Sequence, residues 1–296
     1  MSNSKLKMAY AIQCHTNSEQ VNRLIESLDD ENIDFFIHVD QKSDILKNIT
    51  VKDNVFILRK RIDVQWGGFS QVEATLELLK AIKCKDEEYA YVHLISGQDF
   101  PIKSKDDIQQ FFRETGGSQF IEYVDFPSNF LNRVEVYYPK FFFGRGGKIK
   151  KIIRGVYNRG VMKTFFKRRT NYLPTLYYGS SWFSITSDCV DYILNFIDKN
   201  NEFYNFFKNS FCSDEMFFQT IILNSRFKEK VVNDNLRYID WYKKGLASPK
   251  TLLLEDYSKL INTNKLFARK FDSRIDSQII LRLENSFIKK EKQEIV

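Results

Sequence analysis

Histidine, cysteine, glycine and proline are all scarce in this chain, and each shortage argues against a class of protein or site. The 296 residues include 3 His and 4 Cys, and Cys14, Cys84, Cys189 and Cys212 lie far apart without metal-binding spacing. We therefore expect no zinc site, and we interpret the cysteines as free thiols of a cytosolic protein. With 12 Gly and 5 Pro, long linkers and internal repeats are not expected.

Long apolar runs and nucleotide-binding fingerprints are also missing. No run approaches the roughly 20 residues that span a bilayer, and residues 1–8 lack the apolar core of a signal peptide, so we expect a cytoplasmic protein. The sequence contains neither GxGxxG nor GxxxxGK[ST]. A Rossmann dinucleotide site and a P-loop are therefore not predicted.

Acidic residues are absent from one long interval. The chain has a net charge of +7, and no Asp or Glu occurs between Glu135 and Asp188, where Lys and Arg alternate with aromatic and aliphatic residues. Such a mixture suits an anionic surface, which could be lipid headgroups, nucleic acid or a phosphorylated substrate. No helix-turn-helix or aromatic RNA-binding strand accompanies it, so a nucleic-acid partner is not expected.

Hydrophobic periodicity predicts alternating strands and helices. Buried strands are predicted at 8–14, 34–39, 55–58 and 89–96, and amphipathic helices at 17–28 and 70–82. This order is typical of an α/β fold with a mostly parallel sheet flanked by helices. Ligands of such sheets bind beyond the carboxyl ends of the strands. The polar residues that follow the strands, namely His15, Asp40 and the turn 96–99, are therefore candidate site residues.

An acidic pair opens the apolar, helix-spaced segment 211–220. Ser213 is predicted to cap a helix and to place Asp214 and Glu215 in its first turn, where the helix dipole stabilises negative charge. One interpretation is simply a well-capped helix. The other is that one carboxylate is a general base. Because adjacent helical residues point about 100° apart, the two acids cannot both face the same substrate atom.

Several segments together resemble one enzyme family. Over roughly residues 8–272, the order of these segments and the residues in them are similar to those of the core-2/I-branching β-1,6-N-acetylglucosaminyltransferases. This family also contains peptide O-xylosyltransferases. The segments that carry the resemblance are FIHVD (36–40), WGGFSQVEA (66–74), LISGQDFPIKS (94–104), YGSSWF (178–183), SDE (213–215), Trp241 and LFARKFD (266–272).

The resemblance implies a GT-A-like nucleotide-sugar fold in a single domain, here residues 1–272, followed by an exposed helical tail at 273–296. It implies an inverting glycosyltransferase that moves a sugar, with GlcNAc or xylose favoured, from a UDP-sugar to a glycan hydroxyl. It also implies that no divalent metal is needed, because basic side chains neutralise the diphosphate. The sequence agrees, since Asp40 in HVDQK lacks the second carboxylate of a metal-binding Asp-x-Asp.

The family pattern assigns roles to individual residues. Glu215 matches the catalytic base, and Lys270 matches a lysine that binds the diphosphate. A second basic residue is expected nearby, for which Lys250 is preferred and Arg269 is the alternative. His15 and Asp40 complete the predicted donor side. The predicted acceptor side consists of Ser96, Gln98, Asp99, Arg133, Trp182, Asp214 and Trp241.

Some of these residues have structural interpretations that the sequence leaves open. Asp99 could be no more than a turn-forming residue before Phe100, Trp241 could be a core residue, and His15 could be structural. Asp214 could likewise be structural. A noncatalytic homologue and a basic-surface nucleic-acid or membrane-binding protein are the alternative functions.

We expect neither the membrane anchor nor the disulfide framework of the animal members of the family, and the bias towards Lys, Asn, Ile and Phe is common in AT-rich bacterial genomes. We therefore expect a bacterial member that acts in surface polysaccharide synthesis. Its acceptor would be a glycan, carried on a polyprenyl diphosphate at the inner face of the cell membrane. Residues 140–169 are predicted to dock on that anionic membrane.

Overall fold

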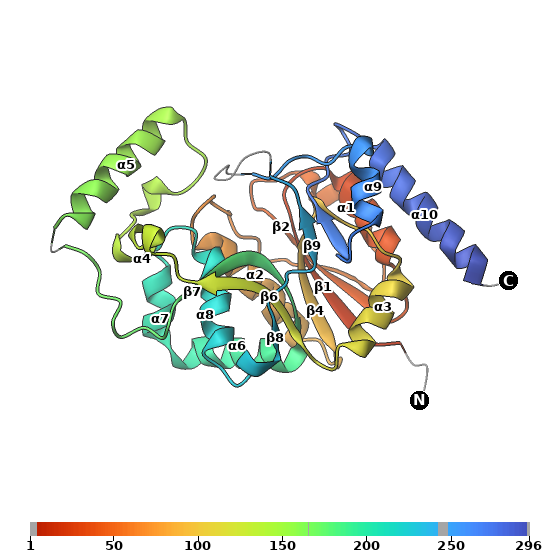
Figure 1. Ribbon diagram of the computed structural model, residues 1–296, viewed down its shortest axis with the longest axis horizontal. Coiled ribbons are helices and arrows are strands. Elements are labelled where there is room, and N and C mark those ends of the chain that lie inside the picture. Colours follow the sequence, from red (N-terminus) through yellow and green to blue (C-terminus); the bar gives the residue numbers. More distant parts are fainter. Residues whose placement is uncertain (1–4, 165, 242–247, 295–296) are drawn as a thin grey trace.

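A seven-stranded, mostly parallel sheet forms the centre of the protein, as a computed structural model describing residues 5–164, 166–241 and 248–294 shows (Figure 1). The strand order is β3-β2-β1-β4-β7-β6-β8, and only β7 runs against the others. The strands are β1 (Met8–Cys14), β2 (Ile33–Val39), β3 (Val55–Ile57), β4 (Tyr91–Ser96), β6 (Gln119–Asp125), β7 (Tyr177–Thr186) and β8 (Val231–Val232).

A second, three-stranded sheet lies beside the first. It has the order β5-β10-β9, and its strands are β5 (Asp99–Pro101), β9 (Arg237–Ile239) and β10 (Phe267–Arg269). Strand β5 follows β4 after a tight turn, and β10 pairs antiparallel with it, so that Arg269 lies opposite Asp99. This small sheet brings the C-terminal part of the chain to the carboxyl end of β4.

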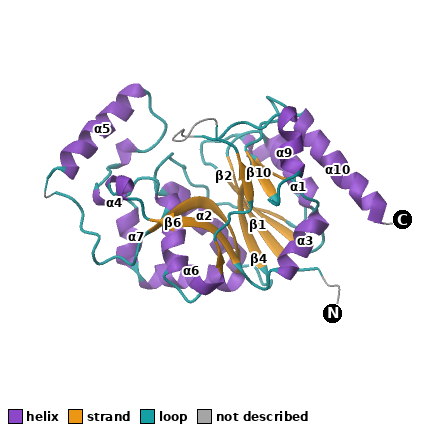
Figure 2. Cartoon of the chain, viewed as in Figure 1, coloured by secondary structure: helices purple, strands orange, loops and turns teal. Residues whose placement is uncertain are grey.

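Helices cover both faces of the central sheet (Figure 2). Those packed around one core are α1 (Ser18–Leu28), α3 (Lys105–Glu114), α9 (Tyr257–Ile261) and α10 (Gln278–Glu294). Those around the other are α2 (Ser70–Lys83), α6 (Ser187–Lys199), α7 (Asn201–Phe207) and α8 (Phe217–Leu223). The short α4 (Asn132–Glu135) and the longer α5 (Lys148–Met162) lie together at one end, at the left of Figure 1.

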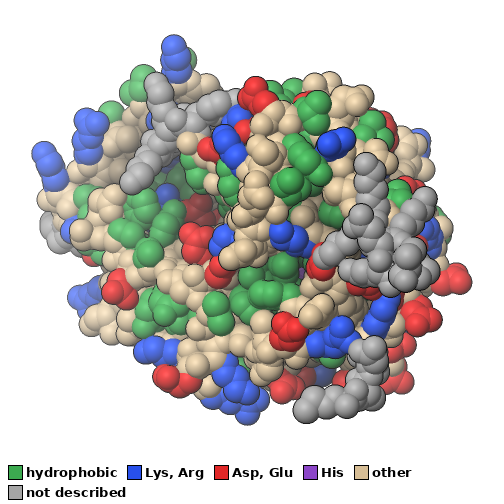
Figure 3. All heavy atoms as spheres, turned by 45° about the vertical axis from the view of Figure 1, so that its right-hand side comes forward, with side chains coloured by type: hydrophobic (Ala, Val, Ile, Leu, Met, Phe, Trp, Pro, Cys, Tyr) green, Lys and Arg blue, Asp and Glu red, His purple; other side chains and the backbone are tan. Residues whose placement is uncertain are grey.

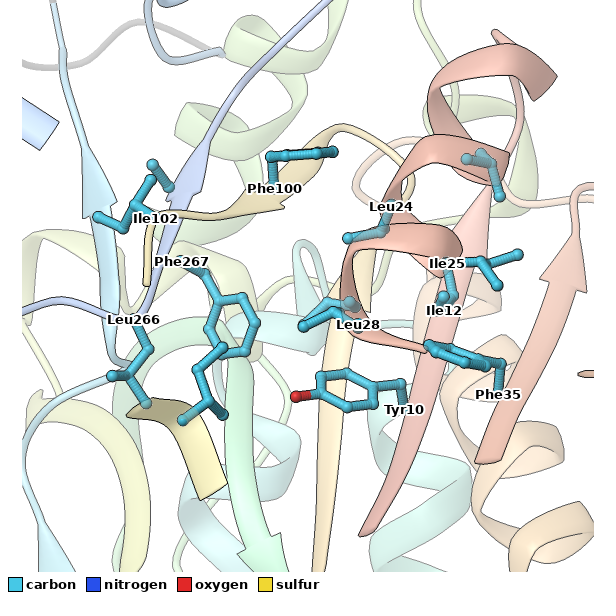
Figure 4. Close-up of a cluster of buried hydrophobic side chains, with 14 of the residues drawn as sticks. Tyr10, Ile12, Leu24, Ile25, Leu28, Phe35, Phe100, Ile102, Leu266 and Phe267 are labelled. Carbon is cyan, nitrogen blue, oxygen red and sulfur yellow. The ribbon is translucent and has the colours of Figure 1, made fainter. Parts of the chain in front are cut away.

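The two cores follow from the two-residue period of the strands. In β1, Tyr10 and Ile12 point into the first core, whereas Ala9 and Ala11 point into the second, since successive side chains of a strand point to opposite faces. Figure 4 shows the first core, in which Tyr10 from β1 and Phe35 from β2 lie against side chains of α1 and of the small sheet. All seven residues of both β1 and β2 are buried. The predicted mostly parallel α/β architecture is therefore confirmed.

Two predicted details are wrong. Ser213–Glu215 form a 3₁₀ turn, and α8 begins only at Phe217. Ser213 does not cap a helix, because its hydroxyl donates to the carbonyls of Phe207 and Ser210. The C-terminal tail is helical over Gln278–Glu294, but it is not an exposed appendage. Ile279, Ile280 and Leu283 are fully buried in the first core, because one face of this helix is apolar.

Candidate functional site

The carboxyl ends of three parallel strands meet at one edge of the central sheet. The backbone N–H of Asp40 donates to the Cys14 carbonyl at 2.9 Å, and that of Gly97 donates to the Gln13 carbonyl, also at 2.9 Å. His15, Asp40 and the 96–99 turn therefore lie side by side, as predicted. A Cβ at Gly97 would lie 2.8 Å from Cys14 Cβ, so only glycine allows the turn to pass this closely.

Asp99 is fully buried and organises the turn. Its carboxylate accepts hydrogen bonds from the Ser96 backbone N–H at 3.1 Å and the Ser96 hydroxyl at 3.0 Å. Two guanidinium groups lie next to it, Arg269 at 3.2 Å and Arg237 at 3.7 Å. With no exposed surface, Asp99 forms the turn and positions the arginines, and it cannot reach an acceptor directly. Burial lowers the pKa of Arg237 to about 10.

Trp182 lies against this cluster. The Arg269 guanidinium carbon is 4.4 Å from the centre of the Trp182 ring, a cation–π arrangement that holds both side chains. Trp182 is half-buried at the middle of β7, and Gln98 is also half-buried. The backbone of Gln98 is fixed, since its N–H donates to the Ser96 hydroxyl and its carbonyl accepts from Phe271.

Glu215 lies in a second cluster with Arg133 and Tyr178. The Arg133 guanidinium donates a short hydrogen bond to the Glu215 carboxylate, and Tyr178 interacts with both side chains. Burial is the largest single effect on the pKa of Arg133 and lowers it, but Glu215, Cys212 and Tyr178 together raise the pKa above its usual value. Burial and Glu215 together raise the pKa of the Tyr178 hydroxyl. The Glu215 side chain keeps 31% of its surface exposed, so a substrate hydroxyl can approach it.

Asp214 points in a different direction from its neighbour. Its carboxylate accepts a hydrogen bond of 2.6 Å from the Ser181 hydroxyl of β7, whereas Glu215 faces Arg133. Burial and the nearby negative charge of Glu215 raise the pKa of Asp214 to about 6. The expectation that the two acids face different partners is thus confirmed, even though they lie on a 3₁₀ turn.

Four basic side chains lie together at the sheet edge. Lys270 follows β10, His15 follows β1, Lys42 follows β2, and Arg145 precedes α5. His15 keeps exposed surface, yet desolvation by the surrounding protein lowers its pKa. The negative charge of Asp40 opposes this effect. The positive charges of Arg145, Lys42 and Lys270 lower the pKa further. Arg145 and Arg269 similarly act on Lys270, whose pKa is lowered first by burial. Positive charge is therefore concentrated at the sheet edge.

The remaining predicted residues occupy less direct positions. Both carboxylate oxygens of Asp256 hold the Lys250 ammonium, at 2.7 and 2.8 Å, so this charge is already balanced. Asp40 accepts from the Lys42 backbone at 2.9 Å and lies 3.3 Å from its ammonium. Trp241 is 47% exposed, which excludes the core interpretation. Among the residues that the structure describes, no three His, Cys, Asp or Glu side chains are grouped to hold a metal ion.

Sequence reasoning missed the roles of Tyr178, Arg145, Arg237 and Lys42. Tyr178 was visible as the first residue of YGSSWF, but nothing in that segment links it to Glu215. Arg145 was noticed only as one of many basic residues. The neighbours of these residues come from distant parts of the chain. Tyr178, for example, interacts with Arg133 and Glu215, which are themselves paired across 82 residues.

Comparison with known proteins identifies the enzyme family to which this chain belongs. The family model described as Core-2/I-Branching enzyme matches residues 8–260. The chain therefore belongs to the core-2/I-branching enzyme family.

Particular relatives show how varied this family is. The chain is 24% identical to "Xylosyltransferase oxt" of Drosophila pseudoobscura pseudoobscura over 90% of its length and 31% of the relative. It is 24% identical to "Beta-glucuronosyltransferase GlcAT14B" of Arabidopsis thaliana over 93% of its length and 67% of the relative. It is also 24% identical to a Danio rerio "Beta-1,3-galactosyl-O-glycosyl-glycoprotein beta-1,6-N-acetylglucosaminyltransferase 4", over 97% of its length and 71% of the relative. The chain thus spans about a third of the xylosyltransferase and about two thirds of the other two.

The raised pKa of Asp214 leads to a testable prediction about stability. Between its ordinary pKa of 3.8 and its folded value of about 6, the folded state binds more protons than the unfolded state, so ionisation of Asp214 lowers stability as pH rises. Asp214→Asn keeps an acceptor for Ser181 and removes the charge. A pKa difference is worth about 1.4 kcal/mol per unit, and we reduce this for the partial exposure of the side chain. The free energy of unfolding of the variant at pH 8 should therefore exceed that of the wild type by about 1–2 kcal/mol.

Urea unfolding at pH 4 and pH 8 measures this difference. The gain should be small at pH 4, where the wild-type carboxyl group is largely protonated in the folded state. Asp198→Asn is the matched control, because Asp198 is exposed on α6 and should change stability little at either pH. An equal gain for Asp214→Asn at both pH values would contradict the assignment.

Proposed function

We propose that this protein is an inverting glycosyltransferase that transfers a sugar from a UDP-sugar to a hydroxyl group of a glycan. The observation that carries the proposal is the pair of clusters at the carboxyl edge of the sheet. One presents a carboxylate, Glu215, and the other concentrates positive charge around Lys270. They meet at β7, where Ser181 contacts Asp214 and the next residue, Trp182, contacts Arg269.

In the proposed reaction Glu215 is the general base. Its carboxylate takes the proton of the acceptor hydroxyl as the oxygen forms a bond to the anomeric carbon. The bond from that carbon to the diphosphate breaks, and UDP leaves with the bonding electron pair. Lys270 stabilises the charge that develops on the leaving group. Arg133 and Tyr178 fix the orientation of Glu215, and Asp214 anchors the same turn to β7.

We further propose that the reaction needs no divalent metal. Asp40, the carboxylate nearest the expected metal position, is engaged by Lys42, and the positive charge of the cluster is in place to neutralise the diphosphate. His15 and Asp40 would contact the donor, and Arg269 would contribute charge through its stacked position on Trp182. Exposed Trp241 would offer a face for stacking on an acceptor sugar.

The sugar and the acceptor follow less directly from the site. The names of the relatives include xylosyl-, glucuronosyl- and N-acetylglucosaminyltransferases. We propose GlcNAc or xylose as the transferred sugar, and glucuronic acid is the principal competitor. Synthesis of a bacterial surface polysaccharide remains our proposal for the biological setting.

The direct test is UDP release from a panel of UDP-sugars with EDTA present, comparing the wild type with Glu215→Gln. One donor should be turned over by the wild type. The variant keeps the shape of the side chain but cannot accept a proton, so turnover should fall by about 10²–10⁴-fold while UDP still binds. The matched control is Glu229→Gln. Glu229 is an exposed glutamate in the short turn between α8 and β8, so this variant should leave turnover unchanged.

Two results would overturn the proposal. Turnover that requires added Mn²⁺ or Mg²⁺ would contradict metal independence and direct attention to Asp40. A wild-type protein that binds no UDP would contradict the transferase itself and favour a noncatalytic homologue.

We also propose that the protein docks on an anionic membrane through the outward face of α5. Ile149, Ile152, Ile153 and Val156 recur at helical spacing and are 53–74% exposed. The opposite face of the helix packs inward, where Tyr157 donates to the Tyr137 carbonyl at 2.7 Å. An exposed aliphatic stripe on an otherwise amphipathic helix is typical of interfacial binding.

Charge complementarity favours lipid headgroups as the partner. Lys148, Lys151 and Arg159 are exposed on the same helix and Lys163 is exposed at its C-cap, with no acidic residue between Glu135 and Asp188. Basic side chains project at the upper left edge of the space-filling view, the end of the molecule at which α5 lies (Figure 3). Within the described residues no helix is both long and apolar enough to cross a bilayer. The exposed aliphatic and basic side chains of α5 are what support our proposal of a peripheral association with the membrane, where the acceptor would be linked to a polyprenyl diphosphate.

Vesicle co-sedimentation tests the docking. Ile152→Asp should weaken binding to vesicles that contain phosphatidylglycerol at least about tenfold, because it places a charge in the inserted stripe. Val51→Asp adds the same charge at an 81% exposed position before β3 and should bind like the wild type. Equal binding by both variants would contradict docking through α5.

A further inference from the structure

We propose that Arg145, from the basic segment before α5, is the second diphosphate-binding cation and acts beside Lys270. This inference rests on the proposed function and goes beyond it. It assigns to the donor site a residue from the basic segment 140–169, which we otherwise connect with the acceptor and the membrane. It also resolves which basic residue accompanies Lys270.

The two residues first considered for this role are already engaged by carboxylates. The Lys250 ammonium is bound by both oxygens of Asp256. The Arg269 guanidinium lies 3.2 Å from the fully buried Asp99 and stacks on Trp182. In the part of the chain that the structure describes, no ion pair or side-chain hydrogen bond engages Arg145 or Lys270.

A tight backbone contact places Arg145 at the sheet edge. The preceding residue, Gly144, donates its N–H to the Trp66 carbonyl at 2.9 Å and adopts a left-handed φ of 87°. A Cβ at Gly144 would lie 2.7 Å from Oε1 of Gln65, so a side chain there would be both strained and crowded. Phe143, on the other side of Gly144, is buried in a cluster with Phe211. The backbone that leads into Arg145 is thus held by two consecutive residues.

Hydrogen bonds connect this anchor to the loop after β2. Gln65 donates to the Asp63 carboxylate at 2.7 Å, and the same oxygen accepts from Lys42. Lys42 also donates to the Val64 carbonyl at 2.7 Å. The segment before α5 is therefore attached to the loop that holds Asp40, and Arg145 joins a cluster whose other members follow β1, β2 and β10.

The charges of this cluster are not balanced by its carboxylates. Arg145 lies close enough to Lys270 and His15 to depress the pKa of both, in addition to the effect of burial. The nearby acids are already occupied, since Lys42 engages both Asp40 and Asp63, and Asp272 accepts hydrogen bonds of 2.7 and 2.8 Å from Arg274. Like charges that repel one another at a partly buried place are relieved by a bound polyanion.

A diphosphate suits this arrangement. The guanidinium of Arg145 can donate two parallel hydrogen bonds to phosphate oxygens, while Lys270 acts as a compact charge. Two sources could supply a diphosphate, the UDP portion of the donor and a polyprenyl diphosphate of the acceptor. We assign Arg145 to UDP, because its charge acts on His15 and Lys270, which both belong to the donor side.

Calorimetric titration with UDP, with EDTA present, tests the assignment. Arg145→Ala should weaken UDP binding about tenfold or more, and Arg145→Lys should restore part of the loss because it retains the charge without the bidentate geometry. Lys228→Ala is the matched control, because Lys228 is an exposed lysine in the turn before β8 and lies outside the basic segment. It should bind UDP like the wild type. Uridine, which has no phosphate, should bind the wild type and Arg145→Ala equally.

The outcomes separate this inference from the proposed function. If the wild type binds UDP and Arg145→Ala binds it within about twofold of the wild type, Arg145 does not bind the diphosphate. If Arg145→Ala loses binding of farnesyl diphosphate but keeps that of UDP, the arginine serves the acceptor, and the assignment to the donor is overturned. If the wild type binds no UDP, the transferase proposal itself fails.

Discussion

The buried carboxylate of Asp99 joins the parts of the chain that make the site. It accepts two hydrogen bonds from Ser96 at the end of β4 and lies within 3.7 Å of two guanidinium groups, from β9 and β10. A buried carboxylate is stable only when its charge and its acceptor capacity are satisfied. The small sheet must therefore close against β4, and this closure brings Lys270, which follows β10, to the edge where His15 and Asp40 already lie.

Two side-chain arrangements are then joined through β7. Glu215 is oriented by Arg133 and Tyr178, whereas the cations around Lys270 have few available carboxylates. A group transfer from a diphosphate requires both, a base for the incoming hydroxyl and positive charge for the leaving group. β7 keeps them adjacent, since Ser181 contacts Asp214 and Trp182 contacts Arg269. Family membership and local geometry thus support the same proposed chemistry.

The sequence predicted the strands and helices of the first hundred residues well, because their hydrophobic periodicity is strong. It also predicted which strand ends converge, since parallel strands share one edge. It failed at Ser213 because Cys212 adopts a left-handed φ of 54°, which turns the Ser213 hydroxyl towards carbonyls of the preceding segment. Tyr178 and Arg145 could not be recognised from the sequence, because their neighbours lie in distant segments. For Asp99 the structure favours the turn-forming interpretation over contact with the acceptor.

The segment before and within α5 has two distinct parts in this account. Its first residues are fixed against Trp66 and Phe211 near the donor side, and the helix exposes an aliphatic stripe beyond them. Under the two proposals made above, a membrane-bound acceptor and a soluble donor meet at one place, and the same short segment contributes to both encounters.

The anomeric configuration of the transferred sugar tests the central claim most directly. Glu215 as base and the cations as leaving-group site imply a single displacement, with attack from the face opposite the departing UDP. Proton NMR of the first product formed from an α-linked UDP-sugar should show a β-linked sugar. An α-linked first product would contradict direct displacement and would remove Glu215 from the role of general base.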